Sequence, residues 1–303
     1  MKRILAALIL MIFILIAWAD AVDDGVAAYE KKDYKTAFAK LKPLAEQGVA
    51  KAQYNLGHMY GKGQGVAQDY KQAMRWYTAA AEQGFANAQY KLGEMYYSGQ
   101  GVAQDHKKAV QWLTAAAEQG DAYAQYNLGL IYYKGQDVVQ DYKQAVRWYT
   151  AAAEQGFSNA QYNLGEMYRN GEGVIQDYKQ AARWFTAAAE QGVAEAQYNL
   201  GLMYYNGHGV VQDYKQAVRW YTAAAEQGFS KAQHNLGAVY YNGEGVLQDY
   251  ARAHMWFNIA AANGAKNAPE NRDITAKKMS VTEIEQAQKM ARDCTARKYK
   301  QCK

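Results

Sequence analysis

Apolar residues recur at helical spacing in two neighbouring stretches between Val49 and Gly84. The first stretch carries them one or two helical turns apart, at Ala52, Leu56, Met59 and Tyr60. The second stretch does the same at Ala73, Trp76, Tyr77 and Ala80. Such spacing places the side chains on one face of a helix. The glycine-punctuated residues 61–68 separate the two stretches, so the sequence predicts a helical hairpin.

This pattern recurs six times, at intervals of 36 residues, across residues 49–264. An aspartate, a tryptophan and a glycine keep the phase: Asp69, Asp105, Asp141, Asp177, Asp213 and Asp249; Trp76, Trp112, Trp148, Trp184, Trp220 and Trp256; Gly84, Gly120, Gly156, Gly192, Gly228 and Gly264. A fixed period of this length is typical of a solenoid, in which each unit buries its apolar face against its neighbours. The fold class predicted is therefore all-α, an α/α superhelical solenoid of helical hairpins.

Local signals mark where the two helices of a unit begin and end. Asp69 is predicted as the N-cap of the second helix, with Gln72 completing a capping-box-like pair. Gly84 is placed as the C-cap glycine of that helix. Gly57 lies inside the first helix, where glycine costs about 1 kcal/mol relative to alanine. Because this glycine recurs in every unit, we expect a neighbouring helix to cross closely there.

The segments flanking the repeats are predicted to cap the solenoid. Residues 22–48 resemble a shortened hairpin without the long glycine loop. Residues 265–303 leave the period, and Ser280 with Glu283 forms a capping-box signature. An apolar stripe follows it, at Val281, Ile284, Ala287, Ala291 and Cys294. Solenoid ends need atypical units of this kind to stay soluble.

The first 21 residues have the pattern of a secretory signal peptide. A basic start precedes an apolar run and a small-x-small site, with cleavage after Ala19 or Ala21. The alternative is a membrane anchor, but the run of about 14 to 16 residues is shorter than the roughly 20 needed to span a bilayer. The mature protein is therefore predicted to be exported, periplasmic or secreted, with no stable membrane span.

The chain has two cysteines, Cys294 and Cys302, and both lie near its C-terminus. In an oxidising compartment a close pair usually forms a disulfide. On one continuous helix the two Cα atoms would lie about 12 Å apart, whereas a bridge needs them within about 7 Å. Either the helix ends near Arg297 and the tail folds back to form a bridge, or the thiols stay free.

Charge and residue usage favour binding over catalysis. Loss of Lys2 and Arg3 with the signal peptide lowers the formal charge from +5 to +3, and the charges are interspersed, so no basic stripe indicates nucleic-acid binding. The histidines, His58, His106, His208, His234 and His254, form no helical metal-binding pair. No serine has a lysine three residues later. We therefore predict no catalytic residue, no metal site and no cofactor.

The unit Ala-x-Ala-Gln-Tyr-Asn-Leu-Gly-x-Met-Tyr-x-x-Gly-x-Gly-Val-x-Gln-Asp-Tyr-x-x-Ala-x-x-Trp-Tyr-x-x-Ala-Ala-x-Gln-Gly resembles the Sel1-like repeat, a relative of the tetratricopeptide repeat. The resemblance implies an α/α superhelix that serves as an adaptor, commonly in bacterial envelopes and in host interaction. One exported branch, the Helicobacter cysteine-rich proteins, is associated with penicillin binding and β-lactamase activity. Those proteins carry a disulfide in each repeat, whereas no repeat of this chain contains a cysteine.

One loop departs from the repeat pattern. Asp137 stands where the other units have a second loop glycine, at Gly65, Gly101, Gly173, Gly209 and Gly245. If the position needs a positive φ, aspartate is among the tolerated residues.

In tetratricopeptide-like stacking the first helix of each unit lines the concave face. Two rows would then face a partner. The first is Tyr54, Tyr90, Tyr126, Tyr162, Tyr198 and His234, and the second is Tyr97, Tyr133, Arg169, Tyr205 and Tyr241. Tyrosine suits recognition surfaces because it brings contact area and a hydroxyl at low entropic cost. The alternative is that one row packs between units.

The sequence thus predicts a non-enzymatic adaptor that binds a protein or peptide through a concave tyrosine-rich groove. Envelope regulation and host interaction are the roles that the resemblance implies. Two other functions stay open at this point. One is an enzyme acting on β-lactams or muropeptides, and the other is a purely structural spacer.

Overall fold

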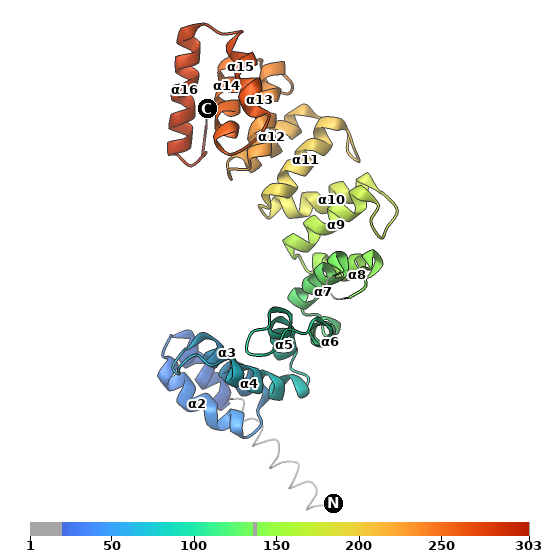
Figure 1. Cartoon of the computed structure of the whole chain (residues 1–303), viewed down its shortest axis with the longest axis vertical. Helices are drawn as coiled ribbons and strands as arrows, with labels where there is room; N and C mark the ends of the chain where they lie inside the picture. Colours follow the sequence, from blue (N-terminus) through green and yellow to red (C-terminus); the bar gives the residue numbers. More distant parts are fainter. Residues whose placement is uncertain (1–19, 136–137, 303) are drawn as a thin grey trace, which may run out of the picture. The chain divides into compact units, whose positions relative to one another are not determined.

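The structure is a computed structural model that describes residues 20–135 and 138–302. In this part of the chain every regular element is an α-helix, which confirms the predicted fold class. The first helices of the repeats are α3 (Ala50–Lys62), α5 (Ala86–Ser98), α7 (Ala122–Lys134), α9 (Ser158–Asn170), α11 (Ala194–Asn206) and α13 (Ser230–Asn242). The second helices are α4 (Tyr70–Glu82), α6 (His106–Glu118), α8 (Tyr142–Glu154), α10 (Tyr178–Glu190), α12 (Tyr214–Ala225) and α14 (Tyr250–Ala262). Figure 1 shows these helices following one another along the chain.

The chain divides into two compact units, Met1–Ala152 and Ala153–Lys303. In each unit the buried core lies between successive hairpins. One cluster of the first unit joins Tyr77 of α4 to Leu92 of α5, and one of the second joins Phe185 of α10 to Leu200 of α11. The predicted apolar faces are confirmed at the buried residues Ala52, Leu56, Met59, Ala73, Trp76, Tyr77 and Ala80, whereas Tyr60 is half-buried.

The two helices of a hairpin approach closely at the recurring glycine. A β-carbon built on Gly165 would lie only 2.7 Å from the ring carbon Cδ1 of Phe185. The equivalent glycines face the second helix of their own repeats at 2.5 to 2.9 Å: Gly57, Gly93, Gly129, Gly201 and Gly237. The predicted close crossing is confirmed, and it occurs within the hairpin.

Asp69 caps the second helix, as predicted, but its backbone has another partner. Its carboxylate accepts hydrogen bonds from the backbone N–H groups of Lys71 and Gln72, at 2.9 and 3.0 Å. A full capping box would also occupy the N–H group of Asp69. That group instead donates to the carbonyl of Tyr60, at 3.0 Å. The aspartate therefore closes the loop onto the first helix as well as starting the second.

The turn that follows the second helix satisfies its last carbonyl groups. Gln83 is the C-cap, and Gly84 follows it in the left-handed region at φ +85°. The N–H of Gly84 donates to Ala81, and that of Phe85 donates to Ala80. This is the Schellman arrangement, in which the C-cap glycine is the left-handed residue just past the helix end, so the role predicted for Gly84 is confirmed.

Glutamine side chains join each repeat to the one before it. Gln53 is buried and donates to the carbonyl of Ala45 in the preceding hairpin, at 3.1 Å. Gln83 donates to the side-chain oxygen of Gln53 at 2.8 Å and to the carbonyl of Gly48 at 2.9 Å. The buried residues with equivalent bonds are Gln89, Gln125, Gln161, Gln197 and Gln233. Each of these buried side-chain amides has a hydrogen-bond partner, so its burial does not carry the free-energy cost of an unsatisfied polar group.

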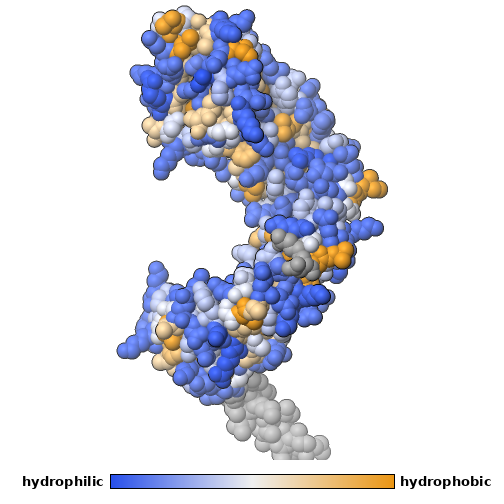
Figure 2. All heavy atoms as spheres, viewed as in Figure 1, coloured by the Kyte–Doolittle hydropathy of each residue, from blue (hydrophilic) through white to orange (hydrophobic). Residues whose placement is uncertain are grey.

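The visible surface is mainly hydrophilic, with separate hydrophobic patches (Figure 2). Part of the exposed apolar area comes from one loop position that recurs at Val139, Ile175, Val211 and Leu247, each about 90% exposed. The preceding valine points inward, and Val138 and Val210 pack against buried clusters. The first apolar residue of the loop therefore packs inward, whereas the apolar residue after it is left in solvent.

At the N-terminal end, residues 20–30 are helical and α2 (Tyr34–Glu46) follows. Val22 and Leu41 are buried in one cluster with Leu56 of the first repeat. The predicted signal peptide lies outside the described residues except for its last two positions, and Asp137 lies outside them too. None of the described helices has the length and apolar character that a bilayer crossing requires.

After the sixth repeat come α15 (Ala268–Ala276) and α16 (Val281–Ala296). The predicted capping box between Ser280 and Glu283 is confirmed. The predicted apolar stripe is wrong at Val281, which is 74% exposed. Contact with α14 is made by later turns of α16, where Ala291 and Cys294 join a buried cluster.

The two cysteines are joined by a disulfide. Helix α16 ends with Arg297 as its C-cap, and the tail turns back. This brings the Cα atoms of Cys294 and Cys302 to 5.1 Å, within the range for a bridge.

Candidate functional site

The row that begins at Tyr54 is half-buried and takes part in packing. The ring centroid of Tyr54 lies 5.8 Å from that of Tyr77 and 5.3 Å from that of Phe85, which opens the next repeat. Burial raises the pKa of Tyr54 above its usual value. The equivalent ring pairs are Tyr126–Tyr149, Tyr162–Phe185, Tyr198–Tyr221 and His234–Phe257. Each of these rings has one side on the second helix and leaves only part of its surface for a partner.

Tyr90 differs from the other members of this row. Its ring centroid lies 5.9 Å from that of Tyr123 in the next repeat, and its hydroxyl donates to the carboxylate of Glu94. Lys91 binds the other oxygen of this carboxylate at 2.6 Å. The negative charge of Glu94 is therefore held by two donors of its own helix.

The row that begins at Tyr97 lies at the C-terminal end of the first helices. Each tyrosine there contacts the aromatic residue that begins the second helix of its own repeat. The centroid distances are 4.9 Å for Tyr97–His106, 5.4 Å for Tyr133–Tyr142, 5.2 Å for Tyr205–Tyr214 and 5.4 Å for Tyr241–Tyr250. All four tyrosines are half-buried. The structure thus places this row over the helix–helix junction, with one edge in solvent.

Repeat four fills this position with Arg169. Its guanidinium pairs with Glu166 of the same helix and donates to the side-chain oxygen of Asn199 in α11, at 3.3 Å. Asn199 also donates to Glu166, at 2.6 Å. Burial raises the pKa of Glu166, and the charge of Arg169 opposes that shift. A polar network therefore takes the place of the aromatic ring.

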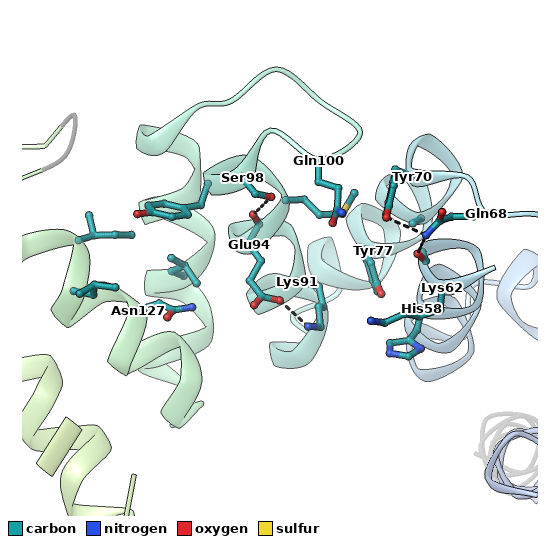
Figure 3. Close-up of a pocket in the computed structure, with 17 residues that line it drawn as sticks. His58, Lys62, Gln68, Tyr70, Tyr77, Lys91, Glu94, Ser98, Gln100 and Asn127 are labelled. Carbon is teal, nitrogen blue, oxygen red and sulfur yellow. Dashed lines mark hydrogen bonds and ion pairs between the residues drawn. The ribbon is translucent and has the colours of Figure 1, made fainter. Parts of the chain in front are cut away.

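Repeat one has Gly61 at the same position, and a cavity of about 510 Å³ opens beside it (Figure 3). The cavity lies wholly within the first unit and takes side chains from five consecutive helices, α3 to α7. The labelled residues around it include His58, Lys62, Tyr70, Tyr77, Lys91, Glu94 and Asn127. Its volume is within the range of about 300–1,000 Å³ that is usual for ligand pockets.

The imidazole ring of His58, which lines this cavity, is held in place by a tyrosine from the N-terminal helix. The hydroxyl of Tyr29 donates to Gln64 at 2.6 Å and lies 3.1 Å from Nδ1 of His58. Because that hydroxyl has one proton, we assign Nδ1 of His58 as the donor and Nε2 as an acceptor. Burial lowers the pKa of His58, and the charges of Lys91 and Lys62 lower it further. The ring is therefore neutral near pH 7.

A shallower hollow of about 420 Å³ lies beside His234 in the second unit. Nε2 of His234 is 2.8 Å from the side-chain nitrogen of Asn271, so the ring is held in place. Within the described residues, no three histidine, cysteine, aspartate or glutamate side chains gather as a metal site would require.

The sequence pattern did not indicate the cavity itself. It showed that Gly61 and Arg169 interrupt a tyrosine row, but not that Lys62, Tyr70 and Lys91 surround the first of these interruptions. The available signal was the loss of a large side chain at one position of an otherwise regular row.

The repeats match a known family model. The Sel1 repeat model matches residues 50–85, 86–121, 122–157, 158–193, 194–229 and 230–264. A Sel1 repeat protein from Oxalobacter formigenes is 34% identical, with a TM-score of 0.67 over 80% of this chain and 96% of that one. No curated protein matches the chain.

Two further solved structures are similar in sequence. A protective antigen of uropathogenic Escherichia coli strains is 31% identical, covers 94% of this chain and 78% of its own, and has a TM-score of 0.48. The Helicobacter pylori cysteine rich protein B is 30% identical over 43% of this chain and 92% of its own, with a TM-score of 0.34. The family model spans well over half of the chain, and the chain belongs to the Sel1 repeat family.

Proposed function

We propose that this protein is an exported adaptor that binds a protein or peptide partner through the face formed by its first helices. Sel1 repeat proteins are in general non-enzymatic scaffolds for protein interactions. In this proposal residues 22–48 and 265–303 cap the repeats, and the two tyrosine rows contribute the contact surface. The C-terminal disulfide agrees with an oxidising compartment.

The observation that carries the proposal is a contrast between two neighbouring positions of the first helix. The packing position is leucine in all six repeats and at most 1% exposed: Leu56, Leu92, Leu128, Leu164, Leu200 and Leu236. Two residues later the side chain is half-buried and differs between repeats: His58, Glu94, Leu130, Glu166, Leu202 and Ala238. Stacking therefore uses one constant residue, whereas the position beside the tyrosines holds four different residue types over the six repeats. Such local diversity favours a specific partner over a uniform spacer.

The test is affinity capture from an envelope extract with the mature protein as bait. A variant with Tyr97, Tyr133, Tyr205 and Tyr241 changed to alanine should lose the captured partner. The matched control changes four exposed lysines of the second helices, Lys71, Lys107, Lys143 and Lys215, to alanine and should keep it. Circular dichroism must show that both variants remain helical. Equal capture by all three proteins would overturn the proposal.

Export is tested separately. The N-terminus of the protein recovered from the periplasm or the culture medium should begin after Ala19 or Ala21. An intact N-terminus on membrane-bound protein would support the anchor instead.

A further inference from the structure

The repeats of this chain provide an internal comparison for the cavity at Gly61. The second helix of every hairpin begins with an aromatic residue, and that ring usually has an aromatic neighbour. The pairs are Tyr34–Tyr29, His106–Tyr97, Tyr142–Tyr133, Tyr178–His208, Tyr214–Tyr205 and Tyr250–Tyr241, with centroids 4.9 to 5.4 Å apart. Of these helix-starting rings, Tyr70 is the one without a ring partner among the described residues. Its hydroxyl accepts a hydrogen bond from the Gln68 side chain at 2.9 Å.

The helices have not closed over the place where Gly61 lacks an aromatic side chain, and space remains there. A β-carbon built on Gly61 would meet one atom within 4 Å, the methyl carbon of Ala73 at 3.7 Å, which is ordinary van der Waals contact. By contrast, a β-carbon on Gly57 in the same helix would meet Tyr77 at 2.9 Å. The space beside Gly61 can therefore accept a large side chain. Four other repeats of this chain fill that position with tyrosine.

The charges around the cavity are not balanced. Glu94 is held by Tyr90 and Lys91. Lys62 is exposed and pairs with no carboxylate among the described residues. His58 is held by Tyr29 and offers an acceptor nitrogen. The side of the cavity formed by α3 thus presents an unpaired positive charge beside the open aromatic position.

We infer that this cavity is a pocket for an aromatic side chain of a partner peptide that carries a negative charge beside the ring. The ring takes the position that Tyr97, Tyr133, Tyr205 and Tyr241 fill in their own repeats, and it packs against Tyr70. The neighbouring carboxylate pairs with Lys62. This inference rests on the proposed function, because the peptide is a segment of the partner that binds the first helices.

The pocket is tested with small probes that represent the side chain. Ligand-observed NMR titrations of the mature protein use p-cresol, which is the tyrosine side chain, together with the anion 4-hydroxyphenylacetate and the cation tyramine. We expect all three to bind, with the anion about two- to fivefold tighter than p-cresol, the usual size of an exposed ion pair, and tyramine weaker. Cyclohexylacetate, which has the charge without the aromatic ring, should bind at least threefold more weakly than 4-hydroxyphenylacetate.

Three variants separate the contributions. Gly61→Tyr supplies the missing ring from the chain itself and should weaken all three aromatic probes at least tenfold while the protein stays helical. Lys215→Tyr adds a tyrosine at an exposed position of a second helix in the second unit and should leave probe binding unchanged. Lys62→Gln should keep p-cresol binding and abolish the preference for the anion. Equal binding of p-cresol to the wild type and to Gly61→Tyr, or no binding to the wild type, would overturn the inference.

The failure of this pocket is distinguishable from the failure of the proposed function. If no probe binds and the four-tyrosine variant still loses the captured partner, the aromatic pocket is wrong and the binding face stands. If probes bind the wild type but not Gly61→Tyr, and all bait proteins capture the same material, the pocket stands and the adaptor function is wrong.

Discussion

Gly57 and the ring of Tyr77 are packed so closely that a β-carbon on the glycine would lie 2.9 Å from the ring carbon Cδ1. This contact sets the approach of α3 and α4, the two helices of repeat one. One turn later in the same helix, a β-carbon on Gly61 would meet only the methyl carbon of Ala73, at the ordinary contact distance of 3.7 Å. The two glycines therefore separate the effect of a close contact from that of helix propensity.

We expect Gly57→Ala to lower the free energy of unfolding by about 1–3 kcal/mol, because the added methyl group forces the Tyr77 ring to move. Gly61→Ala should raise it, by up to about 1 kcal/mol, because alanine favours the helix and meets no close atom. Urea denaturation followed by circular dichroism measures both. Equal effects of the two substitutions would show that the crossing is looser than described.

The buried glutamines should matter more than the exposed ones. Gln197 donates to the carbonyl of Ala189 at 3.0 Å and accepts from Gln227 at 2.8 Å. Gln197→Leu leaves these groups without their partner and should cost about 1–3 kcal/mol. Gln212→Leu is the control, since Gln212 is exposed and donates to the backbone carbonyl of Tyr205. Chemical denaturation should show little change for the control, and a similar loss in both variants would contradict the role of the buried bond.

The stability of the protein should depend on pH through His254. This side chain is 3% exposed, and burial, followed by the charge of Arg272, lowers its pKa, while Asp273 acts in the opposite direction. The unfolded state therefore binds the proton more readily. Stability is fully present above the unfolded pKa of about 6.5 and declines as pH falls from there toward the folded value.

His254→Val should reduce this decline, because valine occupies the equivalent position at Val110, Val146 and Val218. Urea midpoints measured from pH 7.5 to pH 5 test the prediction. His58, whose pKa is also lowered, remains in both proteins and serves as common background. Parallel curves for the wild type and the variant would rule out a contribution from His254.

Loss of the disulfide should loosen the C-terminal tail. Cys302 closes a short loop with Cys294, and Tyr299 in that loop donates to the side chain of Asn263 at 3.0 Å. By the chain-entropy relation, a loop of this length contributes about 2–3 kcal/mol. Cys302→Ser should speed amide hydrogen exchange in residues 297–302 and leave the first unit unchanged. A reducing agent should act on the wild type but not on the variant, and an effect on both would point to another cause.

The strict period explains why so much of the fold could be predicted. Ala73, Trp76 and Tyr77 keep their spacing in a helix, and Asp69 and Gly84 mark its ends, so local rules were sufficient. The partner of the Asp69 amide was missed because it depends on the path of the loop back to Tyr60.

The candidate site was less accessible to sequence reasoning. A tyrosine such as Tyr54 has the same pattern whether it packs on Tyr77 or faces a ligand, and here its ring is half-buried. The cavity at Gly61 needs side chains from three consecutive repeats. No local rule could show that these side chains leave a gap.

The position of the core between hairpins has a consequence for how this molecule can change. Each junction uses the same leucine, alanine and glutamine positions, so removal of one 36-residue segment in phase would bring together two surfaces that already match. We therefore expect the chain to tolerate the loss or gain of whole units, while the odd position at Gly61 travels with whichever segment holds it.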